Sequence, residues 1–79
     1  MTEAERMLQA EGYKKEFGND AQQIYRKKKS SHTSHMIFNL NRKSIEVARY
    51  NEYGMHQNKE ITRGQLKAML KKMEELGWI

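Results

Sequence analysis

Two segments at opposite ends of the 79-residue chain carry the same start and stop signals of an α-helix. Each begins with the spacing of a capping box, in which two side chains satisfy free amide groups of the first turn. These pairs are Thr2 with Glu5, and Thr62 with Gln65. Gly12 and Gly77 each precede an aromatic residue, which is typical of a left-handed stop. The sequence therefore predicts a helix over residues 3–11 and a second from Thr62 to Gly77.

Between these helices the spacing of apolar residues changes to the alternation of β-strands. Three segments are predicted strands: Gln22–Lys28, Ser34–Leu40 and Ile45–Tyr50. In the second segment Met36 and Phe38 share one face, whereas His35 and Ile37 lie on the other. Residues 14–20 contain Gly, Asn and Asp together and predict a loop, with Phe17 at the core edge. Residues 51–60 are polar and predict a long mobile loop, in which Met55 is exposed.

This order predicts a single α+β domain over residues 1–79, with the elements helix, three strands, helix. The second helix carries a predicted apolar stripe, consisting of Leu66, Met69, Leu70, Met73 and Leu76. An antiparallel sheet of this size has to bury its apolar side, so both helices are expected on one face. A domain of this length buries only about 60% of its unfolded surface, so the core is thin.

The composition excludes several classes of protein. The chain has no cysteine, which excludes a disulfide framework and a thiolate zinc site and favours the cytoplasm. Residues 1–6 include three charged side chains where a signal peptide would need an apolar run, and no apolar stretch is long enough to span a bilayer. Neither export nor a membrane partner is therefore expected. No catalytic motif is present, such as a cysteine nucleophile or a glycine-rich phosphate loop. We therefore expect a protein that binds rather than catalyses, without a cofactor.

An excess of positive charge is the main functional signal. The net charge is +5 and the pI is about 9.6, which favours polyanions or acidic proteins as partners. Most candidate binding residues lie in one run, which contains Tyr25, Arg26, Lys27, Lys28, Lys29, His32 and His35. The cations suit phosphate oxygens, and Tyr25 is predicted to offer a stacking surface to an unpaired base. Alternatively, the run is a solvated edge whose lysines discourage pairing between strands.

A second basic feature lies on the predicted C-terminal helix. Arg63, Lys67 and Lys71 are four residues apart and stack along one face, which is also what a plain solvent face would show. The two basic features would form one nucleic-acid surface if the fold places them on the same side. A metal site is not expected from the three histidines, because His32 and His35 are three apart on a strand and point to opposite faces.

Four short pieces carry a resemblance to small uncharacterised proteins of bacteriophages and prophages of Gram-positive bacteria. The pieces are Ala10–Tyr13, Met36–Phe38, Ile61–Ala68 and Glu74–Trp78. The resemblance implies a phage accessory protein, a class that includes inhibitors of host defence nucleases, and thus an anti-CRISPR-like role. Proteins of this kind are often acidic mimics of nucleic acid, whereas this chain is basic.

The predicted element order is also similar to that of double-stranded-RNA-binding domains, where basic residues at the last helix meet phosphates. Arg63, Lys67 and Lys71 fall near that place, but the Lys-Lys cluster expected at the helix start is absent. Three hypotheses remain open. The chain binds a host protein or protein–nucleic-acid complex, it binds DNA or RNA with little sequence preference, or it is a small assembly subunit. Monomer and homodimer are both compatible with the sequence.

Overall fold

The computed structural model of the protein describes residues 1–57 and 60–79. Its elements are α1 (Glu3–Ala10), β1 (Lys14–Gly18), β2 (Gln22–Lys28), β3 (His32–Asn39), β4 (Ser44–Asn51), β5 (His56–Gln57) and α2 (Arg63–Glu75). The strands form one antiparallel sheet in the order β1-β2-β3-β4-β5. The predicted α+β class is confirmed. The prediction of three strands is wrong, because β1 and the short β5 extend the sheet at its two edges.

Strand β1 occupies most of the predicted loop 14–20. It pairs with β2, and a β-bulge interrupts the register between Lys15 and Phe17. The turn signal belongs to a shorter segment, where the side-chain Oδ1 of Asn19 accepts the N–H groups of Ala21 and Gln22 at 2.8 Å. Phe17 is 48% exposed, so its predicted place at the core edge is wrong.

The predicted long loop 51–60 is also more structured than expected. The side-chain Oδ1 of Asn51 accepts the N–H groups of Tyr53 and Met55 at 2.9 Å, which closes a tight turn. The chain then returns as β5 and pairs with β4. Met55 is exposed, as predicted. Residues 58 and 59 of the predicted loop lie outside the described residues.

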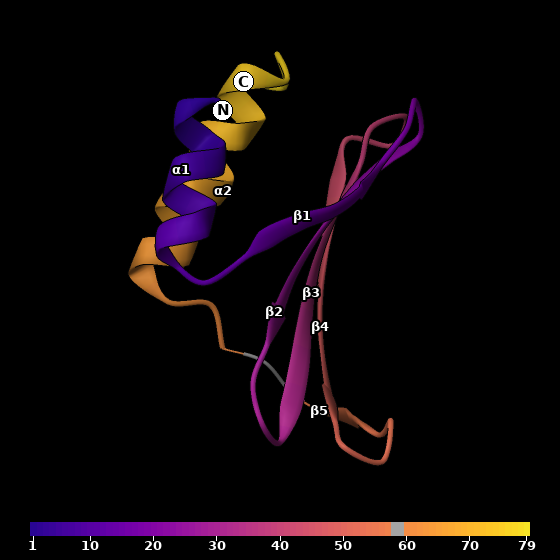
Figure 1. Ribbon diagram of the computed structural model, residues 1–79. Coiled ribbons are helices and arrows are strands. Elements are labelled where there is room, and N and C mark those ends of the chain that lie inside the picture. Colours follow the sequence, from indigo (N-terminus) through magenta and orange to yellow (C-terminus); the bar gives the residue numbers. More distant parts are fainter. Residues whose placement is uncertain (58–59) are drawn as a thin grey trace.

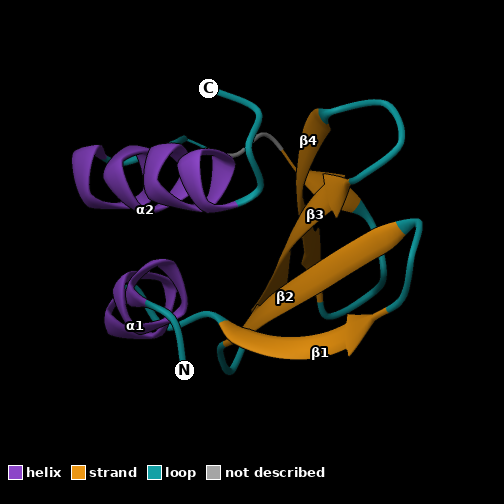
Figure 2. Cartoon of the chain, turned by 90° about the horizontal axis from the view of Figure 1, so that it is seen from above, coloured by secondary structure: helices purple, strands orange, loops and turns teal. Residues whose placement is uncertain are grey.

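Both helices cover the same face of the sheet, as the two views of the molecule show (Figures 1 and 2). The core between helices and sheet contains Leu8, Tyr13, Tyr25, Met36, Phe38 and Ala68. The rings of Tyr25 and Phe38 meet edge to face, with 5.7 Å between their centroids. Strand β3 begins at His32 rather than at Ser34, but the predicted faces are confirmed, since Met36 and Phe38 are fully buried.

The apolar stripe predicted for α2 is only partly buried. Leu66 and Leu70 are 49% and 44% exposed, whereas Gln65, Ala68 and Lys72 are buried. The small side chain of Ala68 permits a close approach to α1 and the sheet, and Lys72 contributes a long aliphatic stem. Because these residues face the core, α2 is rotated relative to the prediction and presents the two leucines to solvent.

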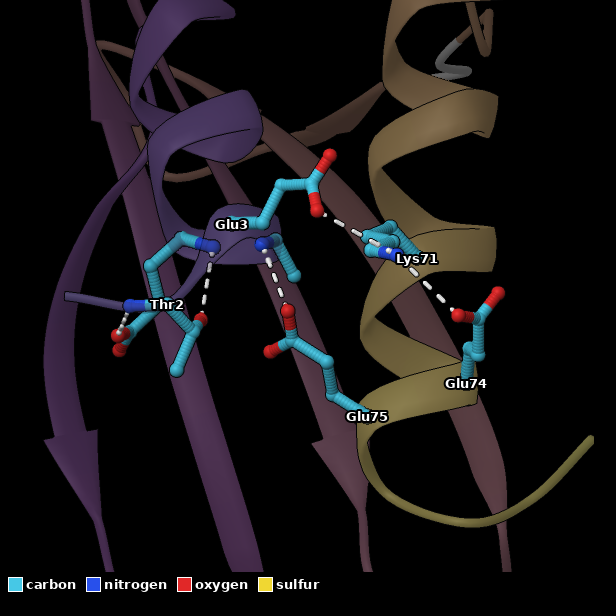
Figure 3. A network of polar contacts seen from close by, with 7 residues as sticks. Thr2, Glu3, Lys71, Glu74 and Glu75 are labelled. Atoms are coloured by element: carbon cyan, nitrogen blue, oxygen red, sulfur yellow. Dashed lines mark hydrogen bonds and ion pairs between the residues drawn. The ribbon is translucent and has the colours of Figure 1, made fainter.

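The helices lie antiparallel, and polar side chains join them at both ends; Figure 3 shows the end that carries Glu75. Glu75 near the end of α2 accepts the backbone N–H of Ala4 in α1 at 2.9 Å. Glu11, which follows α1, accepts the hydroxyl of Thr62 at the start of α2 at 3.5 Å. Both predicted capping boxes are confirmed. The pair of helices is therefore closed at both ends by polar contacts.

Candidate nucleic-acid interface

The face of the sheet turned away from both helices is left open by every described element (Figure 2). Directly paired residues on neighbouring strands share a face, so the register assigns the side chains. This open face contains Lys14, Phe17, Gln22, Ile24, Arg26, Lys28, Thr33, His35, Ile37, Asn39, Ser44, Glu46, Ala48, Tyr50 and His56. It is polar at one end, apolar in the middle, and aromatic and basic at the other end.

An aromatic row crosses the open face on strands β3, β4 and β5. The ring of Tyr50 lies between two imidazoles, with centroid distances of 6.1 Å to His35 and 5.4 Å to His56. The interplanar angles are 62° and 86°, so the rings meet edge to face. Such contacts hold the rings in place. The half-buried Tyr50 and His35 thus form a supported aromatic surface rather than free side chains.

A group of cations adjoins the aromatic row on strands β1 and β2. Lys14 pairs in register with Arg26, which pairs with His35. Lys28 lies in the next row, opposite Thr33, and Thr33 in turn lies opposite Tyr50. Arg26 donates through Nε to Glu16 at 2.7 Å, and both side chains remain exposed. The cations of β1 and β2 therefore lie beside the aromatic rings of β3, β4 and β5 on one continuous surface.

The opposite end of the open face is polar and internally bonded. The side-chain oxygen of Asn39 accepts from Gln22 at 3.0 Å, and its amide nitrogen donates to Ser44 and Glu46 at 3.3 Å. These mutual bonds satisfy the amide of Asn39, which is buried. This end has a structural role, so the candidate binding residues of the open face are those around Tyr50 and the cations.

Two residues of the predicted basic run pack against the core between sheet and helices instead of facing solvent. Tyr25 is 1% exposed, and its hydroxyl lies 3.4 Å from Glu5 and from Gln23. The prediction that Tyr25 stacks on a base is therefore wrong. Lys27 follows the same alternation and places its ammonium over the ring of Tyr13, 5.9 Å from the centroid. It is half-buried and packs against the core.

The other members of the run are divided between the faces and the hairpin turn. Lys29 is exposed at the turn between β2 and β3, where its N–H donates to the carbonyl of His32 at 2.9 Å. His32 lies on the helix-covered face, and its Nδ1 is 3.2 Å from Arg49. His35 lies on the open face, so the predicted separation of these two histidines is confirmed. Within the described ranges, no three metal-binding side chains are grouped closely enough to hold an ion.

The two predicted basic features do not form a common surface. Arg63 and Lys67 are exposed on α2, which lies on the far side of the sheet from Arg26 and Lys28. Lys71 forms ion pairs with Glu3 at 3.4 Å and Glu74 at 3.1 Å (Figure 3). Both carboxylates raise the pKa of Lys71. The condition for a joint surface is therefore not met, and Lys71 joins the two helices through its ion pairs.

Three residues of the interface were missed by the sequence prediction, namely Lys14, Tyr50 and His56. The alternation in 45–50 already placed Tyr50 with Ala48 on the face opposite Val47. It gave no reason to connect Tyr50 with His35, because that contact depends on the register between β3 and β4. Lys14 and His56 belong to edge strands that were predicted as loops.

Comparisons with protein families, curated proteins and solved structures find no match to this chain. Among the described residues, no helix combines the length and the apolar composition needed to cross a lipid bilayer.

Proposed function

We propose that the protein is a non-enzymatic module that binds single-stranded nucleic acid on the open face of its sheet. One observation supports this proposal most strongly. The supported row of His35, Tyr50 and His56 lies on the same face as Lys14, Arg26 and Lys28. Aromatic rings bind unpaired bases by stacking, and cations bind the phosphates between them.

The spacing of the strands allows the rings to stack on bases while the cations bind the phosphates. Neighbouring strands lie about 4.8 Å apart, so Lys28 and Tyr50, two strands apart in one row, have Cα atoms about 10 Å from each other. The long side chain of Lys28 can extend across this distance to the phosphate of a nucleotide whose base stacks on Tyr50. Stacking accepts every base, so we expect little sequence preference. Duplexes bind less well, because their bases are already paired and stacked.

A second candidate function is the one that the phage resemblance implies, namely binding to a host protein such as a defence nuclease. The observation that favours it is the exposure of Leu66 and Leu70 on the outer surface of α2. Exposed apolar side chains that adjoin one another are typical of protein interfaces. The two candidates use opposite sides of the molecule, so substitutions can separate them.

The test measures binding of labelled single-stranded DNA and RNA by fluorescence anisotropy at several salt concentrations. Tyr50→Ser is expected to weaken binding by about 1–3 kcal/mol, which is the contribution of one stacked base. Arg26→Ser and Lys28→Ser are each expected to reduce the salt slope by about 0.7, as one lost phosphate contact would.

Leu66→Ser provides the matched control, because it alters an exposed residue on the other side of the molecule. It should leave nucleic-acid binding unchanged. If the wild-type protein binds no single strand at low salt, the proposal fails. A loss of binding to a host protein in Leu66→Ser, with Tyr50→Ser unaffected, would establish the second candidate instead.

A further inference from the structure

A cavity of about 380 Å³ lies at the β1 edge of the sheet, beside the open face. Its lining residues are Gly12, Lys14, Lys15, Glu16, Arg26 and Lys28. We infer that this cavity binds a phosphate monoester at the end of a nucleic-acid strand. The inference rests on the proposed function, because it assigns one end of the same binding surface.

The charge of the cavity favours an anion. Four cationic side chains line it, against the single carboxylate of Glu16. That carboxylate accepts from the Nε of Arg26, and this ion pair orients the guanidinium while its other nitrogens can reach an anion. Paired guanidinium and ammonium groups are the usual ligands of phosphate oxygens. The cavity therefore combines an oriented guanidinium with three flexible ammonium groups.

The β-bulge in β1 explains how so many charged residues gather at this edge. Glu16 is the extra residue between the paired positions of Lys15 and Phe17, and bulges redirect neighbouring side chains. Gly12 forms another part of the wall with a backbone φ of +93°. A side chain at Gly12 would meet the stem of Lys27, so this wall stays free of a side chain. The backbone N–H of Gly12 already donates to Gln9, so the phosphate contacts come from side chains.

The position and the charge of the cavity favour a strand end over an internal phosphate. Strand β1 is the outermost strand, so a strand of nucleic acid that crosses the sheet from β5 reaches the cavity last. A terminal phosphate monoester carries roughly 1.5–2 negative charges at neutral pH. A phosphodiester between two nucleotides carries about one. A cavity with an excess of cations therefore gains more from the monoester.

The experiment compares three oligonucleotides of one sequence, which carry a 5′-phosphate, a 3′-phosphate or hydroxyl groups at both ends. We expect at least one phosphorylated strand to bind about tenfold more tightly than the hydroxyl-ended strand, as one additional charge-assisted contact would give. The double substitution Lys14→Ser with Lys28→Ser is expected to remove this ratio. Lys29→Ser removes one positive charge outside the cavity and should preserve the ratio.

The outcomes separate this inference from the proposed function. Tight binding of all three strands with equal affinity would overturn the terminal-phosphate site and leave the open face as the binding surface. A ratio that survives the double substitution would also overturn the site. Inorganic phosphate at constant ionic strength should weaken binding of the tighter phosphorylated strand and leave the hydroxyl-ended strand unaffected. Equal displacement of these two strands would contradict the inference. Failure of every strand to bind would remove the proposed function itself.

Discussion

Lys72 shows how a single charged residue is accommodated in a thin core. The residue is 5% exposed, and its ammonium lies 5.7 Å from the centroid of the Tyr25 ring. Burial lowers the pKa of Lys72, which the nearby carboxylate of Glu5 partly opposes. Burial likewise raises the pKa of Tyr25, and Glu5 adds to that shift. The stem of Lys72 fills space that an apolar side chain would otherwise occupy, at the cost of desolvating its charge.

Replacement of Lys72 by Met is therefore expected to leave stability unchanged or to raise it by about 1 kcal/mol, because Met keeps the volume and removes the buried charge. Urea unfolding measures the change. Lys67→Met on the exposed side of α2 is the control and should stay within about 0.5 kcal/mol. A loss of more than 2 kcal/mol in Lys72→Met would show that the ammonium stabilises the core.

The sequence identified the basic residues correctly, but not the face of the sheet to which each side chain of the run points. Arg26 and Lys28 were predicted as binding residues, and the structure places both on the open face. Tyr25 was included because it adjoins the cations in the chain. The alternation of a β-strand turns it to the opposite face, where it meets Phe38. A run of consecutive residues in a strand therefore cannot form one surface.

The two helices depend on each other through their ends. Glu75 accepts the N–H of Ala4, and this bond is the main reason why the pKa of Glu75 is lowered. A carboxylate is also favoured by the positive end of the helix dipole. The pKa in the folded protein lies below that of the unfolded chain, so the ionised carboxylate stabilises the fold above its ordinary pKa. This contribution is lost as the pH falls through the lowered value.

Glu75→Gln is expected to reduce stability at pH 7 by about 0.5–1 kcal/mol, because the charge that faces the start of α1 is removed. It should also weaken the loss of stability on acidification below pH 4.5, the ordinary pKa of the group. Thermal unfolding at several pH values measures both effects. Glu52→Gln in the exposed turn between β4 and β5 is the control. An equal pH dependence in wild type and Glu75→Gln would contradict the assigned contact.

The helices were predicted almost to the residue, whereas the edge strands were not. Capping boxes and glycine stops act within a few residues of one another, so the local sequence contains the full signal. Strands β1 and β5 carry charged and polar residues and show no alternation of apolar side chains. They form because β2 and β4 offer free edges to which the chain returns. That pairing depends on the register, which a local pattern does not determine.

The whole molecule is a single sheet with two helices on one face, and its other face is left open. The helix-covered face contains the core, and the exposed leucines and basic residues of α2 lie beyond it. The open face brings together cations from β1 and β2 with rings from β3, β4 and β5. The excess positive charge of the chain is therefore divided between the two sides of the sheet. Among the described residues, the open face is the side that combines this charge with a supported aromatic row.

The most direct test of this division follows backbone amide signals by NMR while a single-stranded oligonucleotide is added. We predict that the largest shifts occur at Lys14, Arg26, Lys28, His35 and Tyr50, and that residues 63–70 of α2 change little. Shifts confined to Arg63, Lys67 and their neighbours on α2, with the open face unchanged, would contradict the account.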